Sequence, residues 1–365
     1  MPDPSVNKTV TNLSKPTSTD SGNPVATTRQ ADLLHWLEGL ANTHELQLDT
    51  LEPASGDASF RRYFRVSTRN NGTLIIMDAP PPHENCHPFM HVTGLLADAG
   101  VHVPRIHAHD LANGFMLLDD LGKFTYYQVL QTNPADAALQ SIYRDALAAL
   151  VKMQQAATDG LPVYTADKLR EELSVFPEWY VGQLLKTTLT PAEQSMLSNL
   201  FQLLVDDAIA QPQVLVHRDY HSPNLMLTEP AKNPGVIDYQ DALKGPIAYD
   251  IASLVTDART TWEEPQQLDW AIRYWEMARA ARLPVPDDFA VFHQQYEWIS
   301  LQRNLRILGV FARLSLRDQK HHYLEHIPRV LGYVRQVAFR YQPLRPLIRL
   351  LNRLDELTAP PGEGA

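Results

Sequence analysis

The sequence contains a single cysteine, Cys86, among 365 residues, so no disulfide can form within the chain. Disulfide frameworks are typical of oxidising compartments, and their absence fits a reducing one. Long apolar runs are also missing, because no uninterrupted apolar segment approaches the ~20 residues that a membrane-spanning helix needs. We therefore expect a cytoplasmic protein that has no membrane partner.

The chain also lacks an excess of positive charge, with 42 Asp and Glu against 32 Lys and Arg and a formal net charge of −10. Proteins that bind nucleic acid present basic surfaces, so we expect no nucleic-acid partner. No aromatic residue precedes Trp36, and residues 1–29 are rich in Ser, Thr, Asn and Pro. This composition predicts a disordered tail without the apolar core of a signal peptide.

The rest of the chain changes character from strands to helices. A hydrophobic content of 44% supports a substantial core. Periodicity predicts helices over 31–41, 89–99, 139–154, 167–185 and 191–210, and strands over 60–66, 73–77 and 114–118. This order predicts an α+β fold with a small antiparallel sheet lobe and a large, mainly helical lobe. The predicted divisions are a tail (1–29), a sheet lobe (30–118), a hinge (119–122) and a helical lobe (123–365).

The clearest motif is VLVHRDYHSPNLML at 214–227, which places Asp219 and Asn224 on one short loop between two apolar runs. These runs predict buried strands that hold the loop at both ends. A further short apolar run, residues 235–237, ends in Asp238. Phosphoryl transfer needs a group that accepts the proton of the attacking hydroxyl, and metal ions that neutralise the phosphates. Asp219 suits the first role, and the oxygens of Asn224 and Asp238 suit Mg²⁺.

The two motifs HRDYHSPNLM and VIDYQDALKGPIAYDIASL resemble the aminoglycoside phosphotransferase and choline kinase-like branch of the protein-kinase-like fold. Their Asp-to-Asn spacing follows the kinase pattern H-R-D-x-x-x-x-N, and Asp238 stands where the aspartate of D-F-G would stand. The resemblance implies a bilobal fold with ATP and Mg²⁺ as cofactors. It also implies Asp219 as the catalytic residue, with Asn224 and Asp238 as metal ligands.

The sheet lobe carries the expected nucleotide-binding residues but lacks one of them. Small residues at 54–59 predict a turn whose backbone amides approach phosphate. The third strand, TLIIMDAP, has Met77 or Asp78 where kinases have a phosphate-binding lysine. Arg61, Arg62 and Arg65 are the available cations, and Arg61 and Arg65 share one face because side chains alternate along a strand. The predicted nucleotide-binding residues are Ser55, Gly56, Asp57, Ser59, Arg61, Arg65, Leu118 and Asp119.

Two helical segments suggest a substrate pocket. Glu172, Phe176 and Trp179 follow an i, i+4, i+7 spacing, and an acid beside aromatic rings suits a sugar, although a core stripe with a solvated acid is an equal alternative. Gln302, Arg303 and Arg306 lie within about one turn and suit an anionic substituent, while a solvated polar face is the simpler alternative. The predicted substrate-binding residues are Glu172, Trp179, Tyr220, Gln240 and Arg303.

The segments GDASFRRYFRV, MDAPP, FPEWY and QRNLRILGVFARL resemble a bacterial subgroup of this family that phosphorylates N-acetylmuramate and N-acetylglucosamine at the C1 hydroxyl during cell-wall recycling. This resemblance implies an amino sugar and ATP as small-molecule partners, and we expect a monomer. One alternative is an aminoglycoside or other small-molecule hydroxyl phosphotransferase, which would favour an acidic pocket. A second is a nucleotide-binding regulatory module without activity, suggested by the missing lysine; the intact Asp219, Asn224 and Asp238 argue against it.

Overall fold

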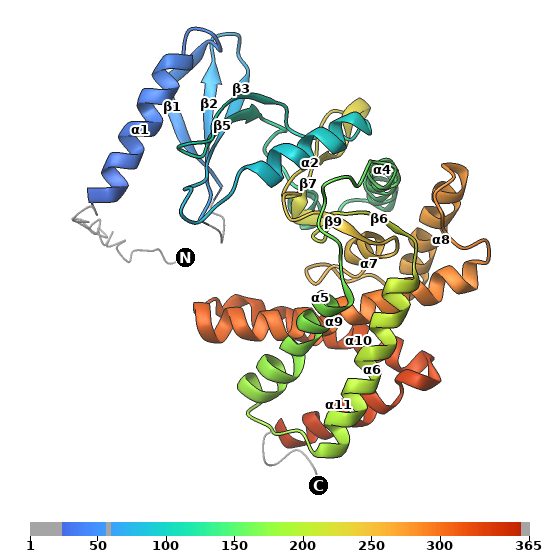
Figure 1. Ribbon diagram of the computed structural model, residues 1–365. Helices are drawn as coiled ribbons and strands as arrows, with labels where there is room; N and C mark the ends of the chain where they lie inside the picture. The colour runs from blue at the N-terminus through green and yellow to red at the C-terminus, as the bar shows by residue number, and fades with distance from the viewer. Residues whose placement is uncertain (1–23, 56–59, 359–365) are drawn as a thin grey trace, which may run out of the picture.

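The computed structural model describes residues 24–55 and 60–358. These residues form a small sheet lobe and a larger, mainly helical lobe, which Figure 1 shows one above the other. The predicted α+β class with an antiparallel sheet is thereby confirmed. No helix in the described part of the chain is long and apolar enough to cross a membrane.

The sheet lobe is built on five antiparallel strands in the order β1-β2-β3-β5-β4. The strands are β1 (Leu46–Ser55), β2 (Arg62–Thr68), β3 (Thr73–Asp78), β4 (Ile106–Asp110) and β5 (Phe115–Asp119). Three of them lie within a few residues of the predicted runs. Sequence inspection missed β4, because its sequence IHAHD carries two histidines and an aspartate instead of a β-branched or aromatic run.

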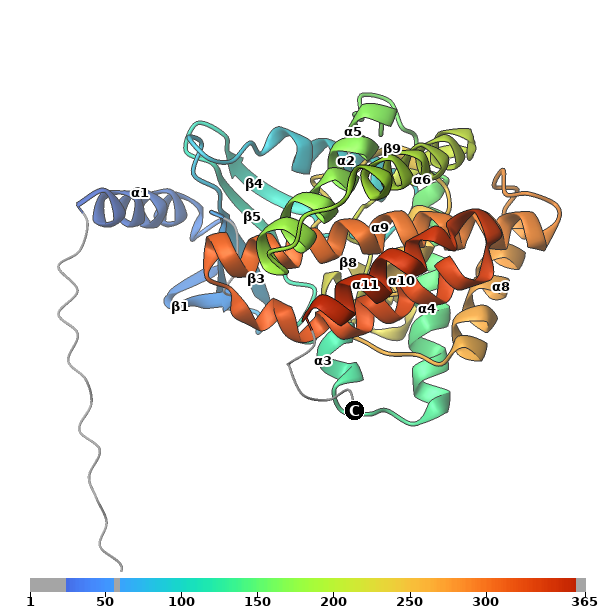
Figure 2. The same cartoon turned by 90° about the horizontal axis from the view of Figure 1, so that it is seen from below.

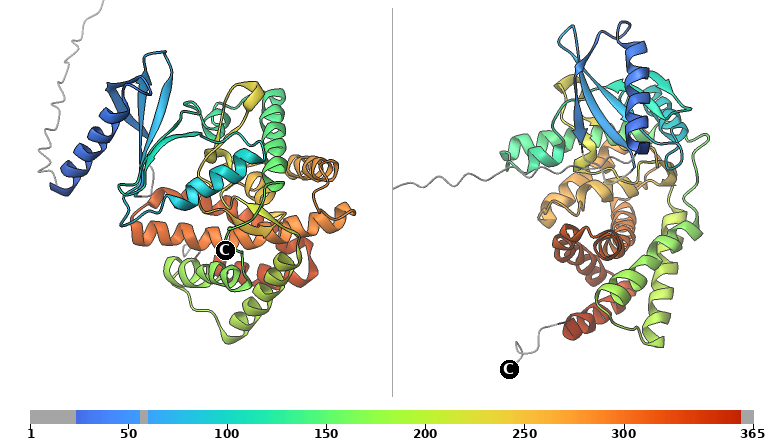
Figure 3. Two further views of the ribbon diagram at one scale, coloured as in Figure 1. Left: turned by 45° about the horizontal axis from the view of Figure 1, so that its top comes forward. Right: turned by 90° about the vertical axis from the view of Figure 1, so that its left-hand side faces the viewer.

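The two faces of the sheet pack against different partners. Helix α1 (Pro24–Leu40) covers one face, where Leu33 and Leu37 form a small core with Ile76 and other strand residues. The opposite face contributes Met77 to the main core, together with helix α2 (His87–Asp98) and the helical lobe. Figure 3 shows α1 lying along the outer side of the sheet, away from the helical lobe.

Strand pairing shows which face of the sheet is occupied by the arginines in and just before β2. Tyr63 stands opposite Met77 and Arg65 opposite Ile75, and residues opposite each other in a sheet share a face. Arg61 and Arg65 therefore lie on the face that looks toward the helical lobe. Arg62 stands opposite Asp78 and lies on the outer face with α1. The predicted shared face of Arg61 and Arg65 is the one turned toward the other lobe.

The helical lobe is organised around the long helix α9, which runs beside α10 in Figure 2. Asp288 caps the start of α9 by accepting a hydrogen bond from Ala290 N at 2.8 Å, and Gln319 ends it in a left-handed conformation with φ 57°. The helices are α3 (Tyr126–Leu130), α4 (Asp136–Gln154), α5 (Ala166–Val175), α6 (Pro191–Ala210), α7 (Tyr249–Val255), α8 (Glu264–Ala280), α9 (Phe289–Asp318), α10 (Ile327–Arg340) and α11 (Pro346–Thr358).

The single helix predicted over 167–185 is wrong in one respect, because α5 ends at Val175 and a π-helical segment, η1 (Phe176–Leu184), continues from it. Pro177 has no N–H to donate to the carbonyl of Leu173, which accepts from Phe176 N instead. The break changes the angular spacing of the side chains after residue 176. Trp179 therefore does not keep the i, i+7 alignment with Glu172 that a continuous α-helix would give.

Candidate active site

Two pairs of short strands hold the predicted catalytic loop. Strand β6 (Gln213–Val216) pairs with β9 (Leu243–Pro246), and β7 (Leu225–Met226) pairs with β8 (Gly235–Val236). Beyond β8, Ile237 N donates to the carbonyl of Asn224 at 3.1 Å. This pairing brings two residues of separate motifs together, and Asn224 Nδ2 donates to Asp238 Oδ2 at 3.2 Å.

The backbone is strained at two positions in or next to the predicted catalytic and metal-binding residues. Arg218 has a φ of 76° and Asp238 a φ of 65°, both in the left-handed region that costs a non-glycine residue free energy. The buried carboxylate of Asp250, on α7, accepts hydrogen bonds from His217 N at 2.7 Å and from Arg218 N at 3.1 Å. These two bonds compensate for the strain at Arg218 and fix the conformation that precedes Asp219.

Asp219 lies in a positively charged environment. Burial raises the pKa of its carboxyl group, but the imidazolium of His221, which forms only at low pH, and the guanidinium groups of Arg306 and Arg303 act in the opposite direction and outweigh burial, so the pKa falls to about 2. Asn224 Nδ2 also donates to the backbone carbonyl of Asp219 at 2.9 Å, which ties the residue to the end of its loop. Asp219 is therefore an ionised acceptor at any physiological pH.

A buried ion network connects the catalytic loop to two helices. Glu172 on α5 accepts hydrogen bonds from Arg218 Nη2, at 2.6 Å, and from the hydroxyl of Tyr164. Its other contact is with α9, where Arg306 Nε lies 3.5 Å from Glu172 Oε2. Glu172 is only 6% exposed, so the structure places this predicted sugar-binding residue inside the protein as the anion of the network.

The other predicted substrate residues lie in different surroundings. Tyr220 is fully buried and donates its hydroxyl hydrogen bond to the carbonyl of Ala146, so it packs in the core behind the loop. Trp179 is partly buried against the main core. Gln240 donates to Asp238 Oδ1 at 2.9 Å and thus borders the candidate metal site.

Both arginines that face the helical lobe form ion pairs. Arg61 Nη2 lies 2.8 Å from Oε2 of Glu84, which precedes α2. Arg65 donates through Nε to Asp120 at 2.6 Å and through Nη2 to Asp120 and to the carbonyl of Gly122, both at 3.0 Å. Arg65 therefore fastens β2 to the predicted hinge, whereas Arg61 lies beside the helix that follows the sheet's third strand.

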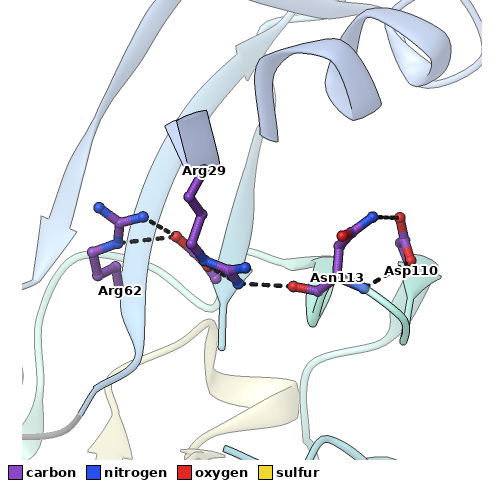
Figure 4. Close-up of polar contacts among 5 residues, drawn as sticks. Arg29, Arg62, Asp110 and Asn113 are labelled. Carbon is purple, nitrogen blue, oxygen red and sulfur yellow. Dashed lines mark hydrogen bonds and ion pairs between the residues drawn. The ribbon is translucent and has the colours of Figure 1, made fainter. Parts of the chain in front are cut away.

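On the outer face, the acid that follows Met77 is enclosed by arginines. The side chain of Asp78 is fully buried and accepts from Arg29 Nε at 2.8 Å and from Arg62 Nε at 2.9 Å. Figure 4 shows Arg29 and Arg62 approaching this carboxylate from two sides, with Arg29 also donating to the carbonyl of Asn113 at 2.8 Å. The cluster ties α1 to the sheet and points away from the helical lobe.

The predicted hinge begins at the end of β5, and the predicted phosphate turn begins at the end of β1. Leu118, at the end of β5, is 3% exposed and belongs to the main core. Asp119 N donates to the carbonyl of Arg105 at 3.0 Å, and its carboxylate contacts His107 Nε2 at 2.6 Å. Ser55 is the last residue of β1. Gly56, Asp57 and Ser59 lie outside the described residues.

Comparison with known proteins identifies the family. Residues 50–287 match the model of the phosphotransferase enzyme family. The chain belongs to this family. A Pseudomonas putida protein named N-acetylmuramate/N-acetylglucosamine kinase is 45% identical over 85% of this chain and 90% of its own length. A Neisseria meningitidis protein of the same name is 41% identical over 89% of this chain and 96% of its own length.

Solved structures show the same fold at low sequence identity. An ethanolamine kinase from Plasmodium vivax superposes with a TM-score of 0.60 at 11% identity, covering 87% of this phosphotransferase and 91% of the kinase. The ADP-bound aminoglycoside phosphotransferase APH(2'')-Ib gives a TM-score of 0.53 at 12% identity, covering 82% and 97% of the two chains. These likenesses confirm the bilobal kinase-like fold.

The donor atoms at the end of the phosphotransferase loop fit a divalent cation. Both hydrogen bonds of the Asn224 side chain come from Nδ2, so its Oδ1 accepts none from the described residues, and Asp238 is exposed beside it. Nowhere in 24–55 or 60–358 do three or more His, Cys, Asp or Glu residues converge as a metal-binding group. A Mg²⁺ ion here would therefore take its remaining ligands from nucleotide phosphates and water, as Mg²⁺ commonly does.

Sequence reasoning missed the role of His221, two residues after Asp219. It is 8% exposed, and its Nδ1 has no hydrogen-bond partner among the described residues. Burial lowers its pKa to about 4, although the carboxylate of Asp257 acts in the opposite direction, so the ring is neutral at physiological pH. In the sequence, only its place within the catalytic motif pointed to His221, because the spacing of residues along the chain does not show which side chains are buried.

Proposed function

We propose that this phosphotransferase transfers the γ-phosphoryl group of ATP, in the presence of Mg²⁺, to the C1 hydroxyl of N-acetylmuramate and N-acetylglucosamine. Support comes from relatives at 41% and 45% identity that carry this substrate pair in their names. The reaction would belong to cell-wall recycling in the cytoplasm, where ATP is available. Phosphoryl transfer to the hydroxyl of a small molecule is the common chemistry of the family.

The observation that carries the proposal is the positive charge around Asp219. Arg303 and Arg306 on α9 act on this carboxylate, and burial keeps their fields strong. A polycationic aminoglycoside would be repelled by such surroundings, whereas a neutral or anionic sugar would not. The site therefore favours a neutral or anionic amino sugar over an aminoglycoside, even though the chain as a whole is acidic.

In the proposed mechanism Asp219 positions the attacking hydroxyl. A pKa of about 2 makes its carboxylate a weak base, which suits a loose transition state in which the proton leaves late. The carboxylate orients the hydroxyl by accepting its hydrogen bond. It takes the proton as the new O–P bond forms and the bond from the γ-phosphorus to the bridging oxygen breaks, which releases ADP. Asn224 and Asp238 would hold Mg²⁺, which neutralises phosphate charge when it is bound.

On the nucleotide side, we propose that Arg61 replaces the missing lysine. Protein kinases pair the lysine of their third strand with a glutamate of the following helix. Here Met77 takes the lysine's face, and the Arg61–Glu84 ion pair provides a cation and an acid at the same junction of sheet and helix. Arg65 has its Nε and Nη2 bound to Asp120 and the Gly122 carbonyl, which makes it a hinge residue in this proposal.

The test is ATP consumption with Mg²⁺ against N-acetylmuramate, N-acetylglucosamine, galactose and kanamycin, for the wild type and Asp219→Ala. We expect turnover of the two N-acetylated sugars and a loss of roughly 10²- to 10⁴-fold in the variant, the usual contribution of a general base. Turnover of kanamycin alone would support an aminoglycoside phosphotransferase. ATP binding without turnover of any acceptor would support a regulatory module.

A further inference from the structure

Arg303 on α9 carries a buried positive charge. Its side chain is 4% exposed, and its Nε and Nη1 have no hydrogen-bond partner among the residues that the structure describes. Burying an unpaired ion costs several kcal/mol, so such groups persist where a ligand supplies the missing charge. Within folded proteins, a buried arginine with free donors marks a place for an anion.

The position of Arg303 places that anion near Asp219, on the side of the site that would bind the phosphoryl acceptor. Arg303 acts electrostatically on Asp219 and on Tyr249, which stands at the start of α7. It lies one turn before Arg306, and residues three apart share a side of a helix. Arg306 is bound to Glu172, which binds Arg218 of the catalytic loop. The side of α9 that carries both arginines is therefore turned toward the loop.

We propose that Arg303 binds the carboxylate of the lactyl ether group of N-acetylmuramate and so sets the preference between the two sugars. This inference rests on the proposed function. The two sugars differ only in the lactyl ether at O3, which ends in a carboxylate, so a residue that distinguishes them must recognise that group. A guanidinium presents its N–H donors in a planar fork that matches a carboxylate. With N-acetylglucosamine, water takes the place of the carboxylate.

The experiment compares kcat/KM for three acceptors: N-acetylmuramate, its methyl ester at the lactyl carboxylate, and N-acetylglucosamine. In Arg303→Met, we expect the ratio of N-acetylmuramate to N-acetylglucosamine to fall at least about 30-fold, because one partner of a buried charge pair has been removed. Arg303→Lys keeps the charge without the fork and should restore part of the ratio. Esterification should lower kcat/KM for the wild type and have little further effect on Arg303→Met.

Arg306→Met is the matched control, because Arg306 lies one turn away but already has a protein partner, Glu172. It should lower kcat/KM for both sugars by similar factors and leave their ratio unchanged. Thermal unfolding separates structural from binding roles. Arg303→Met should keep or raise the melting temperature, because it removes an unpaired buried charge, whereas Arg306→Met should lower it.

The possible results separate failure of the proposed function from failure of the inference about Arg303. A wild-type enzyme that phosphorylates neither sugar would overturn the proposed function, and the inference with it. A wild type that phosphorylates both, with an unchanged ratio in Arg303→Met, would overturn only the inference. Equal losses for both sugars would also contradict it, since Arg303 would then act through Asp219. An ester as good as N-acetylmuramate for the wild type would show that the carboxylate is not recognised.

Discussion

The three arginines in and just before β2 show how neighbouring residues of one type take different roles. Arg62 faces outward and binds Asp78 with Arg29, Arg65 is bound to Asp120, and Arg61 is paired with Glu84. Alternation along a strand predicts that Arg61 and Arg65 share a face. It does not predict their partners, because Glu84 and Asp120 come from segments that only the fold brings near β2.

At the residue scale, the proposed phosphate-binding role of Arg61 predicts a specific kinetic defect. Arg61→Met should raise the KM for ATP and lower kcat/KM for ATP by about 10- to 100-fold, the effect of losing a hydrogen bond to a charged group. Glu84→Gln should give a smaller defect of the same kind, because the guanidinium stays but loses its orienting partner. The measurement is steady-state kinetics with ATP varied at saturating sugar.

Arg62→Met provides the matched control for Arg61→Met. It removes the same charge from the adjacent residue, but on the face that packs with α1. We expect lower stability, because Asp78 loses one of its two arginines, with little change in the KM for ATP. Equal KM values for the wild type and Arg61→Met would contradict the proposed role of Arg61.

At the scale of elements, the strands on both sides of the catalytic loop were predictable and the path of the helices around them was not. Apolar runs on both sides of 217–224 indicated the strands that became β6 and β7, since local sequence dictates them. Strand β9, with the sequence LKGP, has a glycine and a proline that look like a turn, and pairing with β6 makes it a strand. The π-helical segment after α5 begins where α9 passes close to the backbone.

That close passage occurs at Gly309. A Cβ atom there would lie 2.3 Å from the carbonyl oxygen of Val175 and 2.8 Å from Phe176 N, where α5 gives way to η1. Gly309→Ala should therefore lower the free energy of unfolding by about 1–3 kcal/mol, the usual cost of overpacking, because backbone cannot move aside as a side chain can. Denaturant unfolding measures the change.

Gly332→Ala is the control for that prediction. Gly332 lies within α10, and no atom of the described residues beyond its own helix backbone and chain neighbours lies within 4 Å of its would-be Cβ. Alanine there should raise the free energy of unfolding by about 0.5–1 kcal/mol through its better helix propensity. If Gly309→Ala is as stable as Gly332→Ala, α9 does not press on the junction of α5 and η1.

At the scale of the whole molecule, the sequence was sufficient for the fold class and for the loop that carries Asp219. Both are encoded locally, in hydrophobic periodicity and in a motif of fixed spacing. The helical spacing indicated Arg303 and Arg306 as a place for an anionic substituent, but it did not predict that Arg303 is buried, because neither spacing nor a net charge of −10 reports burial. The predicted sugar contact at Glu172 likewise took no account of Arg218, whose partner is set by tertiary packing.

Under the proposed function, the site combines a catalytic motif with surroundings that select the acceptor. Asp219, Asn224 and Asp238 lie in the segments that the two short strand pairs hold, and α9 brings the arginines to them. Solved structures of 11% and 12% identity share the architecture, while their names record different acceptors.

The most direct test is to identify the product formed from N-acetylmuramate and MgATP by ³¹P and ¹H NMR. We predict one phosphate ester at C1, shown by coupling of phosphorus to the anomeric proton and by loss of the interconverting anomers of the free sugar. Phosphate on any other hydroxyl, or no sugar phosphate at all, would contradict the proposed function.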